Sequence, residues 1–328
     1  MDKAILLINV GTPDTSDVGD VKRFLLQFLS DRHVIRMPWL CRQLLVRLFI
    51  VPFRVSRSAA LYRQLWTKDG SPLRFYLEKL CDQLQERMEG RTDVWGAMTY
   101  GKPGVKTVMD NMAQLGYRQL TVIPLFPQYA DSTTGSAEAH VIRQIANWPG
   151  KPELKIVRQF HDHPLFIDAW IDRIRTYHPE RYQQIVFSFH GLPLSHLPKA
   201  CRSENCRCTH PVTTSCYKAS CYATADKLAS GLELTTDRFT VTFQSRLSKH
   251  WMRPFTDEVL KRLASEKKSV LVAAPSFIAD CLETSVELGM EYQKLFLENG
   301  GSDYNWVESL NDHPKWVAAV EAIAGDCI

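Results

Sequence analysis

The sequence predicts an α/β fold made of two doubly wound parallel sheets, one in each half of the chain. Short runs rich in β-branched and aromatic residues alternate with segments of helical periodicity, which is typical of parallel sheets. The runs at 5–8 and 270–274 are apolar throughout, as expected of strands that helices cover on both faces. A helical segment at 164–177 separates two groups of four runs, so we expect two similar halves that meet near residue 155.

Apolar runs predict eight strands along the chain. In the first half they lie at 4–10, 94–100, 120–125 and 154–160, and in the second half at 185–190, 239–243, 270–277 and 306–310. No internal repeat appears as sequence identity, and no low-complexity linker separates the halves. We therefore expect one domain at 1–155 and a second at 156–328. Ligands of doubly wound folds bind at the carboxyl ends of the strands, so the residues after each run are the first candidates for a site.

The composition is that of a globular protein with a packed core. The length of 328 residues exceeds a usual domain of about 100–200 residues, which fits two domains or one large one. Hydrophobic residues make up 45% and charged residues 23%. The 40 Lys and Arg against 36 Asp and Glu leave a net charge of +4, too small and too dispersed for a nucleic-acid surface. Nucleic acid is therefore not expected as a partner.

Neither an export signal nor a membrane span is expected. The apolar run at 4–10 is too short for the core of a signal peptide and indicates a first strand. The stretch nearest to a membrane span, at 37–53, is interrupted by Arg42, Arg47 and two prolines. These features predict a cytoplasmic protein.

His190 ends an apolar strand, at the place where a doubly wound fold carries its site. Gly191 and Pro193 follow it, and together they would hold the imidazole on a fixed rim. A lone histidine in such a place is more often a core residue whose ring bonds a backbone carbonyl. The other strand ends favour the functional interpretation.

Glu283, Glu287 and Glu291 recur every four residues in a predicted helix that follows the seventh strand. Like charges at this spacing repel by about 0.2–0.5 kcal/mol per exposed pair, so stability alone does not favour the row. A solvated acidic face is the alternative interpretation. The row also suits a path for cations or protons, because carboxylate together with imidazole is a suitable ligand set for Fe(II).

A series of short motifs occurs in the order of a known enzyme family. They are NVGTP at 9–13, FLSDR at 28–32, GSP at 70–72, PQY at 127–129 with STTG at 132–135, SFHGLP at 188–193, FQS at 243–245, TDE at 256–258 and DCLET at 280–284. By these motifs the chain resembles ferrochelatases over nearly its whole length. The resemblance implies an enzyme that inserts Fe(II) into protoporphyrin IX to form protohaem. It also implies two Rossmann-like lobes with the active-site cleft between them.

The resemblance assigns roles to individual residues. His190 would accept the pyrrole protons or deliver the metal, opposite Glu283, and Glu287 and Glu291 would continue the metal path. The residues expected to line the cleft and grip the porphyrin are Val10, Tyr100, Tyr129 and Trp251. Core packing is the alternative for the three aromatic rings. Two positions depart from some relatives: Cys281 replaces a histidine, and Thr99 replaces an arginine.

Residues 34–58, here called the lip segment, mix arginines with large apolar side chains. Such a mixture is typical of a segment that lies on a membrane surface. The alternative is a helix packed against the body with its arginines extended to water. In the family this region forms an apolar lip, and relatives that use coproporphyrin carry a tyrosine in place of Val10. Both features favour protoporphyrin IX and peripheral association with the inner membrane.

The segment at 201–221 is rich in cysteine. It holds five of the nine cysteines, Cys201, Cys206, Cys208, Cys216 and Cys221. Four thiols would satisfy a structural zinc site, and the opening Cys-x4-Cys matches the spacing of plant-type iron–sulfur proteins. Disulfide pairing is the alternative, and a reducing compartment disfavours it.

The resemblance favours iron and sulfur, because many ferrochelatases carry a [2Fe-2S] cluster. This chain has Asp131 at the usual first ligand and only Cys327 near the end, so the usual cluster would not form. We therefore expect a cluster held by four of the five loop cysteines, with Cys201 or Cys221 as the odd thiol and zinc as the alternative.

Two further classes of protein compete with the enzyme. A porphyrin or haem carrier would need the aromatic cleft but no base opposite a carboxylate. A two-lobed metal-binding receptor would usually be exported. A homodimer is an open alternative to a single chain.

Overall fold

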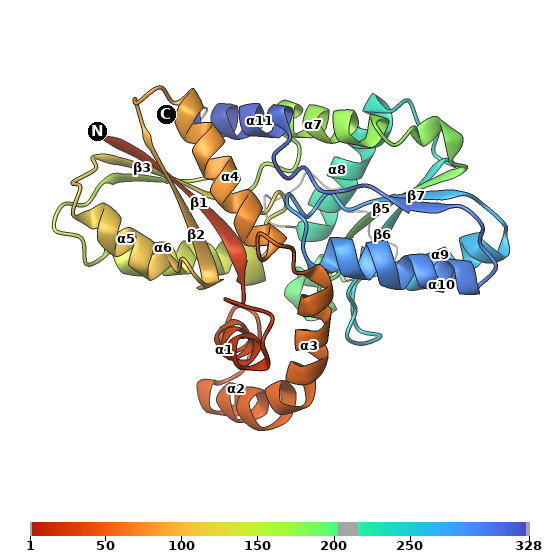
Figure 1. Ribbon diagram of the computed structural model, residues 1–328, viewed down its shortest axis with the longest axis horizontal. Helices are drawn as coiled ribbons and strands as arrows, with labels where there is room; N and C mark the ends of the chain where they lie inside the picture. The colour runs from red at the N-terminus through yellow and green to blue at the C-terminus, as the bar shows by residue number, and fades with distance from the viewer. Residues whose placement is uncertain (1, 203–215, 326–328) are drawn as a thin grey trace. The chain divides into compact units, whose positions relative to one another are not determined.

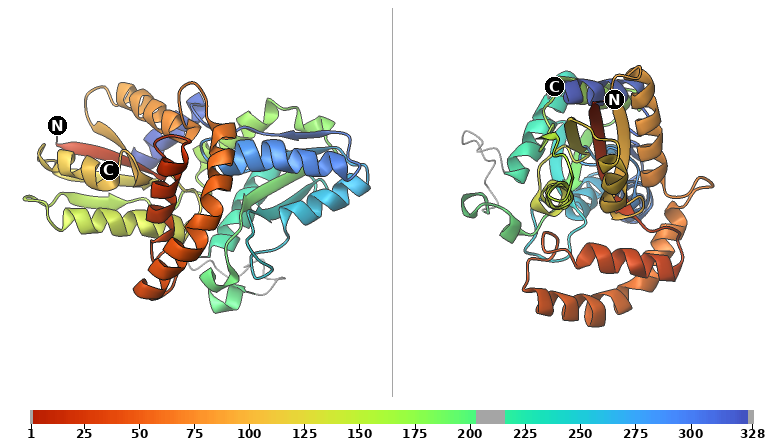
Figure 2. Two further views of the ribbon diagram at one scale, coloured as in Figure 1. Left: turned by 60° about the horizontal axis from the view of Figure 1, so that its bottom comes forward. Right: turned by 90° about the vertical axis from the view of Figure 1, so that its left-hand side faces the viewer.

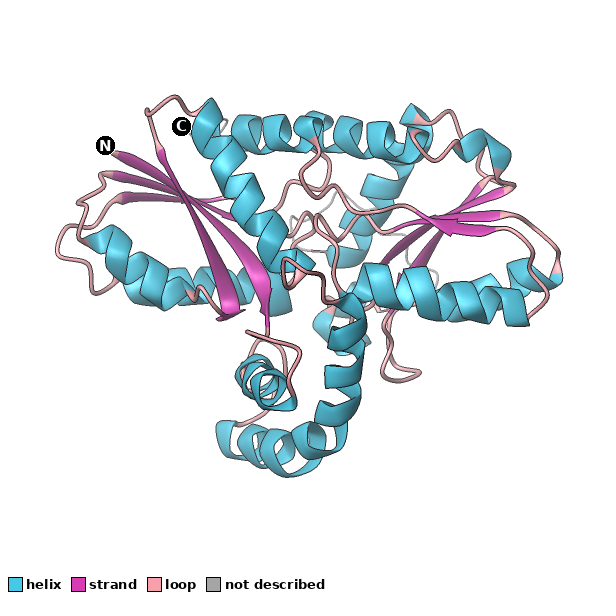
Figure 3. Cartoon of the chain, viewed as in Figure 1, coloured by secondary structure: helices cyan, strands magenta, loops and turns pink. Residues whose placement is uncertain are grey.

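A computed structural model describes residues 2–202 and 216–325 of the chain. The chain divides into two compact units. The first consists of Met1–Phe126, Ala130–Gln159 and Val320–Ile328, and the second of Pro127–Tyr129 and Phe160–Ala319. Each unit holds one four-stranded parallel sheet with helices around it (Figure 1), as the magenta strands and cyan helices of Figure 3 show. The predicted α/β class with two doubly wound sheets is confirmed.

The first unit has the strand order β2-β1-β3-β4, and all neighbours are parallel. The strands are β1 (Lys3–Thr12), β2 (Asp93–Gly101), β3 (Gln119–Pro124) and β4 (Glu153–Ile156). The helices are α1 (Val18–Leu29), α2 (Trp39–Leu44), η1 (Leu45–Ile50), α3 (Val51–Leu65), α4 (Pro72–Arg87), α5 (Val105–Ala113), η2 (Asp131–Gly135) and α6 (Ser136–Ile145). Figure 1 and the right-hand view of Figure 2 show α2, η1 and α3 standing away from the strands of this unit.

The second unit has the order β6-β5-β7-β8, again all parallel. Its strands are β5 (Gln184–His190), β6 (Phe239–Gln244), β7 (Val270–Ala273) and β8 (Tyr304–Trp306). Its longer helices are α7 (Pro164–Arg175), α8 (Tyr217–Gly231), α9 (Thr256–Ser265), the π-helix η6 (Leu282–Tyr292), α10 (Gln293–Glu298) and α11 (Pro314–Gly325), the last of which continues into the first unit. Short 3₁₀ turns are η3 (Pro179–Arg181), η4 (Leu194–His196) and η5 (Lys199–Cys201).

The two sheets share one strand order without sharing sequence, which agrees with the expectation of two similar halves. The predicted division at residue 155 stays a prediction. The strands β4 and β7 are shorter than the runs predicted at 154–160 and 270–277. The strand predicted at 306–310 is wrong in its position, because β8 spans 304–306 and shares only Trp306 with that run. The outer strands β4 and β8 pair over only four and three residues with their single neighbours. Strand β7 ends at Ala273, two residues before Pro275, which has no N–H to donate to a ladder.

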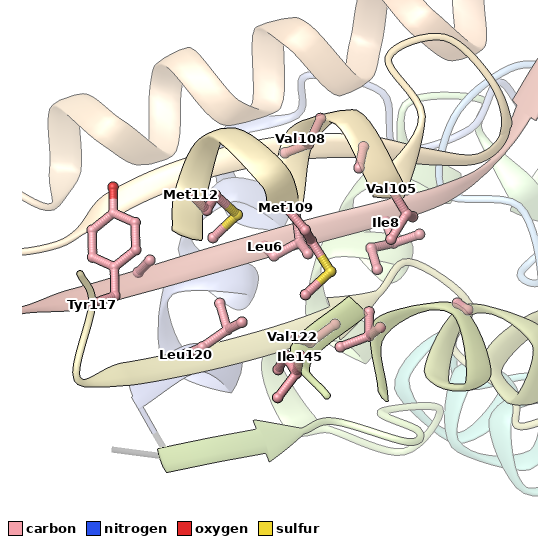
Figure 4. Packing of buried hydrophobic residues seen from close by; sticks show 14 of the residues in the cluster. Leu6, Ile8, Val105, Val108, Met109, Met112, Tyr117, Leu120, Val122 and Ile145 are labelled. Carbon is pink, nitrogen blue, oxygen red and sulfur yellow. The ribbon is translucent and has the colours of Figure 1, made fainter. Parts of the chain in front are cut away.

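One hydrophobic cluster of the first unit lies between the sheet and the helices α5 and α6. Leu6 of β1 and Val122 of β3 are fully buried, and Met109 of α5 packs against them (Figure 4). The apolar residues of α5 recur at Val105, Val108, Met109 and Met112, the spacing of one helix face. A second core in the other unit gathers Val186, Val272 and Phe296 under α9 and α10.

Within the described residues, no helix is both long enough and apolar enough to cross a membrane.

Candidate active site

Strand β5 ends at His190, and the residue after it brings β5 unusually close to β6. A Cβ atom on Gly191 would lie 2.8 Å from the carbonyl oxygen of Gln244. The Gly191 N–H donates to that same carbonyl across 2.9 Å. Glycine is therefore required here for the close approach of two backbones rather than for a special turn. His190 and Gln244 are register partners in the two strands.

Two aromatic rings flank the His190 imidazole. The ring of Trp251 lies 6.3 Å from it and that of Phe277 lies 6.2 Å from it, measured between ring centroids. Trp251 is brought there by the chain after β5, because Pro193 and Trp251 form an antiparallel bridge. The Tyr217 hydroxyl donates to the main-chain carbonyl of His190 across 2.8 Å. The structure thus brings together two residues that the sequence singled out, His190 and Trp251.

Glu283 lies in the first turn of η6, whose start is fixed by Asp280. The Asp280 carboxylate accepts from the Asn311 amide at 2.7 Å and from the Thr284 hydroxyl at 3.0 Å. Thr284 in turn accepts from the Cys281 N–H at 2.9 Å. The Cys281 thiol is buried and hydrogen-bonds Glu283. Burial, together with the charge of Glu283, raises the pKa of the Cys281 thiol well above its usual range. The protonated form of the Cys281 thiol is therefore favoured beside Glu283.

Glu287, one turn further along η6, is enclosed by four hydrogen-bond donors. One carboxylate oxygen accepts from the Gln244 amide at 3.0 Å and the Ser245 hydroxyl at 2.6 Å, and the other accepts from the Ser245 N–H and the Tyr292 hydroxyl, both at 2.9 Å. Burial raises the pKa of Glu287, the nearby Glu283 adds to this, and the hydrogen bonds act against it. Glu291 is exposed. The predicted acidic row thus runs from a caged carboxylate to the surface.

Gln244 connects these parts, although sequence reasoning gave it no role. Its amide nitrogen donates to the Glu283 carbonyl at 2.8 Å as well as to Glu287. The signal in the sequence was a polar pair, Gln244 and Ser245, at the end of an apolar strand. Ser245 has a φ of +62°, a left-handed backbone conformation that residues other than glycine seldom adopt.

Tyr129 belongs to the second unit and is partly exposed. The neighbouring Gln128 anchors it, because the Gln128 side chain donates to the Thr224 hydroxyl at 3.1 Å and accepts from the Ser276 hydroxyl at 3.1 Å. The Ser276 hydroxyl lies 3.4 Å from that of Tyr217, which holds His190. Contacts between the side chains of Gln128, Ser276 and Tyr217 thus connect the loop of Tyr129 with the end of β5 at His190 within this unit.

Val10 and Tyr100 belong to the first unit, at the carboxyl ends of β1 and β2. Gly11 has a φ of +117°, and a Cβ there would overlap the Tyr100 carbonyl, so the two strands require glycine at this place. Val10 is partly exposed, whereas Tyr100 is only 1% exposed. The Tyr100 hydroxyl donates to Asp31 across 2.9 Å. The role of both residues as porphyrin contacts stays a prediction, as does the cleft.

Asp31 is a partly buried carboxylate with several donors around it. Ser136 donates to it at 2.7 Å, and the N–H of His33 donates to it at 2.7 Å. Burial would raise the pKa of Asp31, but hydrogen bonds from His140, His33, Ser136 and Tyr100 outweigh burial and hold it well below its usual range. The carboxylate is therefore charged in the folded protein and fixes the Tyr100 ring.

Asp131, which stands where the resemblance leads us to expect a cluster ligand, contacts two basic side chains. Its two oxygens lie 2.9 Å from the His33 ring and 2.8 Å from the Arg36 guanidinium. These partners lie where the lip segment begins. Asp131 thus ties the start of the lip segment to η2.

The cysteine-rich loop is described only at its ends. Cys206 and Cys208 lie outside the described residues. Cys201 ends the turn η5, and Cys216 directly precedes α8. Cys221 is fully buried within α8, and burial raises the pKa of its thiol well above the usual range. Among the residues that the structure describes, no group of three or more His, Cys, Asp or Glu side chains could hold a metal ion.

The lip segment exposes most of its large apolar side chains. Phe53 is 80% exposed, Trp39 68% and Phe49 62%, and Leu40, Leu44 and Leu48 are also exposed. Among the arginines of the lip segment, Arg42 alone is not exposed. It is buried and donates to the carbonyls of Ser30 and Met37 at 2.8 and 2.7 Å, so its role is to hold the segment in shape.

The fold is similar to the folds of two solved structures. The chain aligns with the structure titled "SirB from Bacillus subtilis with Fe3+" at a TM-score of 0.59, covering 100% of this chain and 96% of that one. It aligns with CbiX, titled "the terminal Enzyme for Biosynthesis of Siroheme in Denitrifying Bacteria", at a TM-score of 0.51, covering 99% and 100%. Identity is 11% in both cases, so the likeness concerns the fold alone.

Sequence comparison identifies the family. The ferrochelatase family model matches residues 2–326. A ferrochelatase of Legionella pneumophila (strain Lens) is 36% identical over 332 residues, with 99% of each chain covered. A ferrochelatase of Pseudomonas aeruginosa (strain UCBPP-PA14) is 38% identical over 339 residues, covering 99% of this chain and 98% of the relative. The chain belongs to the ferrochelatase family, and it is an enzyme that inserts iron into porphyrin in haem synthesis.

Proposed function

We propose that the chain inserts Fe(II) into protoporphyrin IX, with His190 and Glu283 acting on the porphyrin nitrogens and the metal. The observation that carries this assignment is the position of Gln244. It is the register partner of His190 and donates to the Glu283 carbonyl at 2.8 Å. The base and the acidic helix are therefore two sides of one site within the second unit.

The reaction requires a base, because iron enters the ring only when two pyrrole N–H protons leave. The unperturbed pKa of histidine suits this step near neutral pH. A flat macrocycle hides its nitrogen lone pairs in the ring plane, so a site must also bend the ring. The Trp251 ring, 6.3 Å from the imidazole, would hold the porphyrin ring against His190. Val10, Tyr100 and Tyr129 remain proposed contacts to the porphyrin.

The acidic row would attract the incoming cation. Glu291 is exposed and would meet Fe(II) first, whereas Glu287 lies within a cage of hydrogen-bond donors. Glu283 lies in the first turn of η6 and would pass the metal toward His190. Loss of charge at Glu291 alone should therefore raise the KM for iron and leave the KM for porphyrin unchanged.

The reaction and the choice of porphyrin are tested together in an anaerobic assay. The purified chain is given Fe(II) with protoporphyrin IX or with coproporphyrin III, and metalloporphyrin is measured by absorbance. Turnover of protoporphyrin IX with little turnover of coproporphyrin III is expected. Binding of either porphyrin without turnover would favour the carrier. Light scattering on the same sample shows whether a second copy of the chain is a partner.

We further propose that the lip segment docks on the inner membrane as a peripheral anchor. Its exposed apolar side chains supply the insertion, with Phe53 80% exposed. From Arg32 to Lys68 the chain has seven arginines, one lysine and no acidic residue, so anionic lipid is the matching surface. The large exposure of these apolar side chains supports docking over a segment packed on the body.

We also propose a [2Fe-2S] cluster held by Cys201, Cys206, Cys208 and Cys216. The two described members, Cys201 and Cys216, offer thiol sulfur, the donor that such a cluster requires. Cys221 is buried in α8 with a raised pKa, which disfavours the thiolate that a ligand must supply, so it is the odd thiol. A bound cluster would supply a coloured iron group with a structural or sensing role. A single zinc ion in the same thiols is the alternative.

A further inference from the structure

Gln244 stands between the strand that carries His190 and the helix that carries Glu283 and Glu287. We infer that Gln244 is a positioning residue of the chelatase site, which sets the acidic helix relative to the imidazole. This inference rests on the proposed roles of His190 and Glu283. Gln244 itself is 1% exposed, so it acts through its neighbours rather than on a substrate.

The orientation of the Gln244 amide is determined by its partners. Its oxygen accepts from the Ser188 hydroxyl across 2.7 Å, and its nitrogen donates to the Glu283 carbonyl and the Glu287 carboxylate. In the reversed orientation the amide oxygen would face two acceptors, and the nitrogen would face the serine. Only one orientation therefore satisfies every group.

Ser188 extends this connection into the core of the second unit. It lies on β5, two residues before His190, and its hydroxyl is fully buried. The Thr256 hydroxyl, at the start of α9, lies 3.0 Å from that of Ser188 and 2.9 Å from that of Thr242 on β6. Hydroxyl groups on β5, α9 and β6 thus form a chain of contacts that ends at the Gln244 amide. The amide in turn fixes the position of η6 through its bonds to Glu283 and Glu287.

Glu287 is the main contact on the helix. Its four donors match the four lone-pair sites of a carboxylate, so the side chain has one hydrogen-bonded position. Ser245 supplies two of the donors from a strained left-handed backbone, and it directly follows Gln244. Residues 244 and 245 together hold Glu287, and through it the turn of η6 that carries Glu283.

A displacement of about 1 Å at a reacting group can reduce turnover by about 100-fold. The test replaces Gln244 by methionine, which keeps the volume and removes the hydrogen bonds. Gln184→Met is the matched control, because Gln184 is 4% exposed and bonds Thr240 across 3.0 Å, joining the same two strands at their other end. We expect Gln244→Met to reduce kcat at least about tenfold, with the Kd for protoporphyrin IX within about twofold of wild type. Gln184→Met should lower the melting temperature to a similar extent and leave kcat near wild type.

Ser188→Ala gives an intermediate case, because it leaves the amide in place and removes one of its anchors. Its kcat should lie between those of wild type and Gln244→Met. The decisive measurement combines Gln244→Met with Glu283→Gln. If Gln244 acts through Glu283, the double variant is no slower than Glu283→Gln alone.

Three outcomes would overturn the inference. The first is equal kcat in Gln244→Met and Gln184→Met, and the second is losses that multiply in the double variant. Either of these leaves the proposed function intact, because wild type still forms haem. The third, a wild-type chain with no chelatase activity on any porphyrin, would overturn the proposed function and the positioning role together.

Discussion

The hydroxyl of Tyr217 donates to the main-chain carbonyl of His190 across 2.8 Å. Tyr217 is the first residue of α8, and Cys216 directly precedes it. The end of the cysteine-rich loop is therefore one residue away from a direct contact with the histidine strand. A change in the loop can therefore move the proposed base through Tyr217. This coupling requires no redox step, and metal insertion itself consumes no electron.

The contact between Tyr217 and His190 predicts that changes in the cysteine-rich loop alter the rate of metal insertion. Cys216→Ser should remove the proposed cluster and lower kcat, because the start of α8 then loses an anchor. Tyr217→Phe should lower kcat several-fold and leave the visible absorption unchanged, since it removes only the bond to His190. Absorption and turnover measured on both variants separate the two effects. Unchanged turnover in both would contradict the coupling.

The cluster itself should give visible bands and iron and acid-labile sulfide near two per chain. Cys206→Ser and Cys208→Ser should abolish the colour. Cys221→Ser should retain it, because that thiol is buried and protonated. Colour lost in Cys221→Ser and retained in Cys201→Ser would reverse the assignment of the odd thiol. One zinc per chain without sulfide would replace the cluster by a zinc site.

Replacement of the proposed base should separate binding from turnover. His190→Ala should bind protoporphyrin IX nearly as wild type, since Trp251 and the other ring contacts remain, and should lose at least about 100-fold in kcat. Porphyrin fluorescence gives the Kd, and an anaerobic Fe(II) assay gives kcat. His250→Ala is the control, because His250 is exposed in the neighbouring loop. Turnover near wild type in His190→Ala would exclude His190 as the base.

Glu283→Gln should also lose about 100-fold in kcat, because the amide cannot carry the negative charge that pairs with the metal and the imidazolium. If His190 and Glu283 act as a unit, the double variant is about as slow as the slower single variant. The same assay on the four proteins measures this. Two losses that multiply would show that the residues act in separate steps.

Removal of the exposed apolar side chains should release the chain from membranes. The variant Trp39→Ser, Phe49→Ser and Phe53→Ser should bind vesicles rich in phosphatidylglycerol at least about 100-fold more weakly, because burial of each large side chain contributes about 1.5–3 kcal/mol. Leu115→Ser with Ile142→Ser is the control, since these residues are 55% and 50% exposed elsewhere in the unit. Binding of wild type should also fall with salt. Equal partitioning of the lip variant and the control would contradict the docking.

Asp31→Asn should destabilise the first unit in a pH-dependent manner. The pKa of Asp31 is lowered in the folded state, so its contribution is complete above the unfolded pKa of about 3.9 and is lost as the pH falls below that value. We expect a loss of about 2 kcal/mol at pH 7, the scale of a hydrogen-bonded charge, and a smaller difference at pH 3. Urea denaturation at both pH values measures this. Asp110→Asn, an exposed partner of Lys106, should cost little at either pH.

Much of the site could be predicted from local pattern. His190 at the end of an apolar strand, with Gly191 after it, indicated a rim residue, and the structure has it at the end of β5 beside Trp251. The helix of Glu283 was also expected, although its π-helical winding was not. Gln244 was named only as part of the FQS motif, and its role was missed because its partners Ser188 and Glu287 lie 56 and 43 residues away in the chain.

The sequence by itself determined the class of fold and the family, because both depend on residues that are close together in the chain: apolar runs, their spacing and the short motifs after them. Only the tertiary structure decided which side chains meet. Asp131 pairs with His33, 98 residues away, and Tyr100 turns its hydroxyl to Asp31. These contacts depend on the register of strands and on the direction from which each helix approaches. No pattern within one segment contains that information, since each hydrogen bond is formed by atoms of two segments.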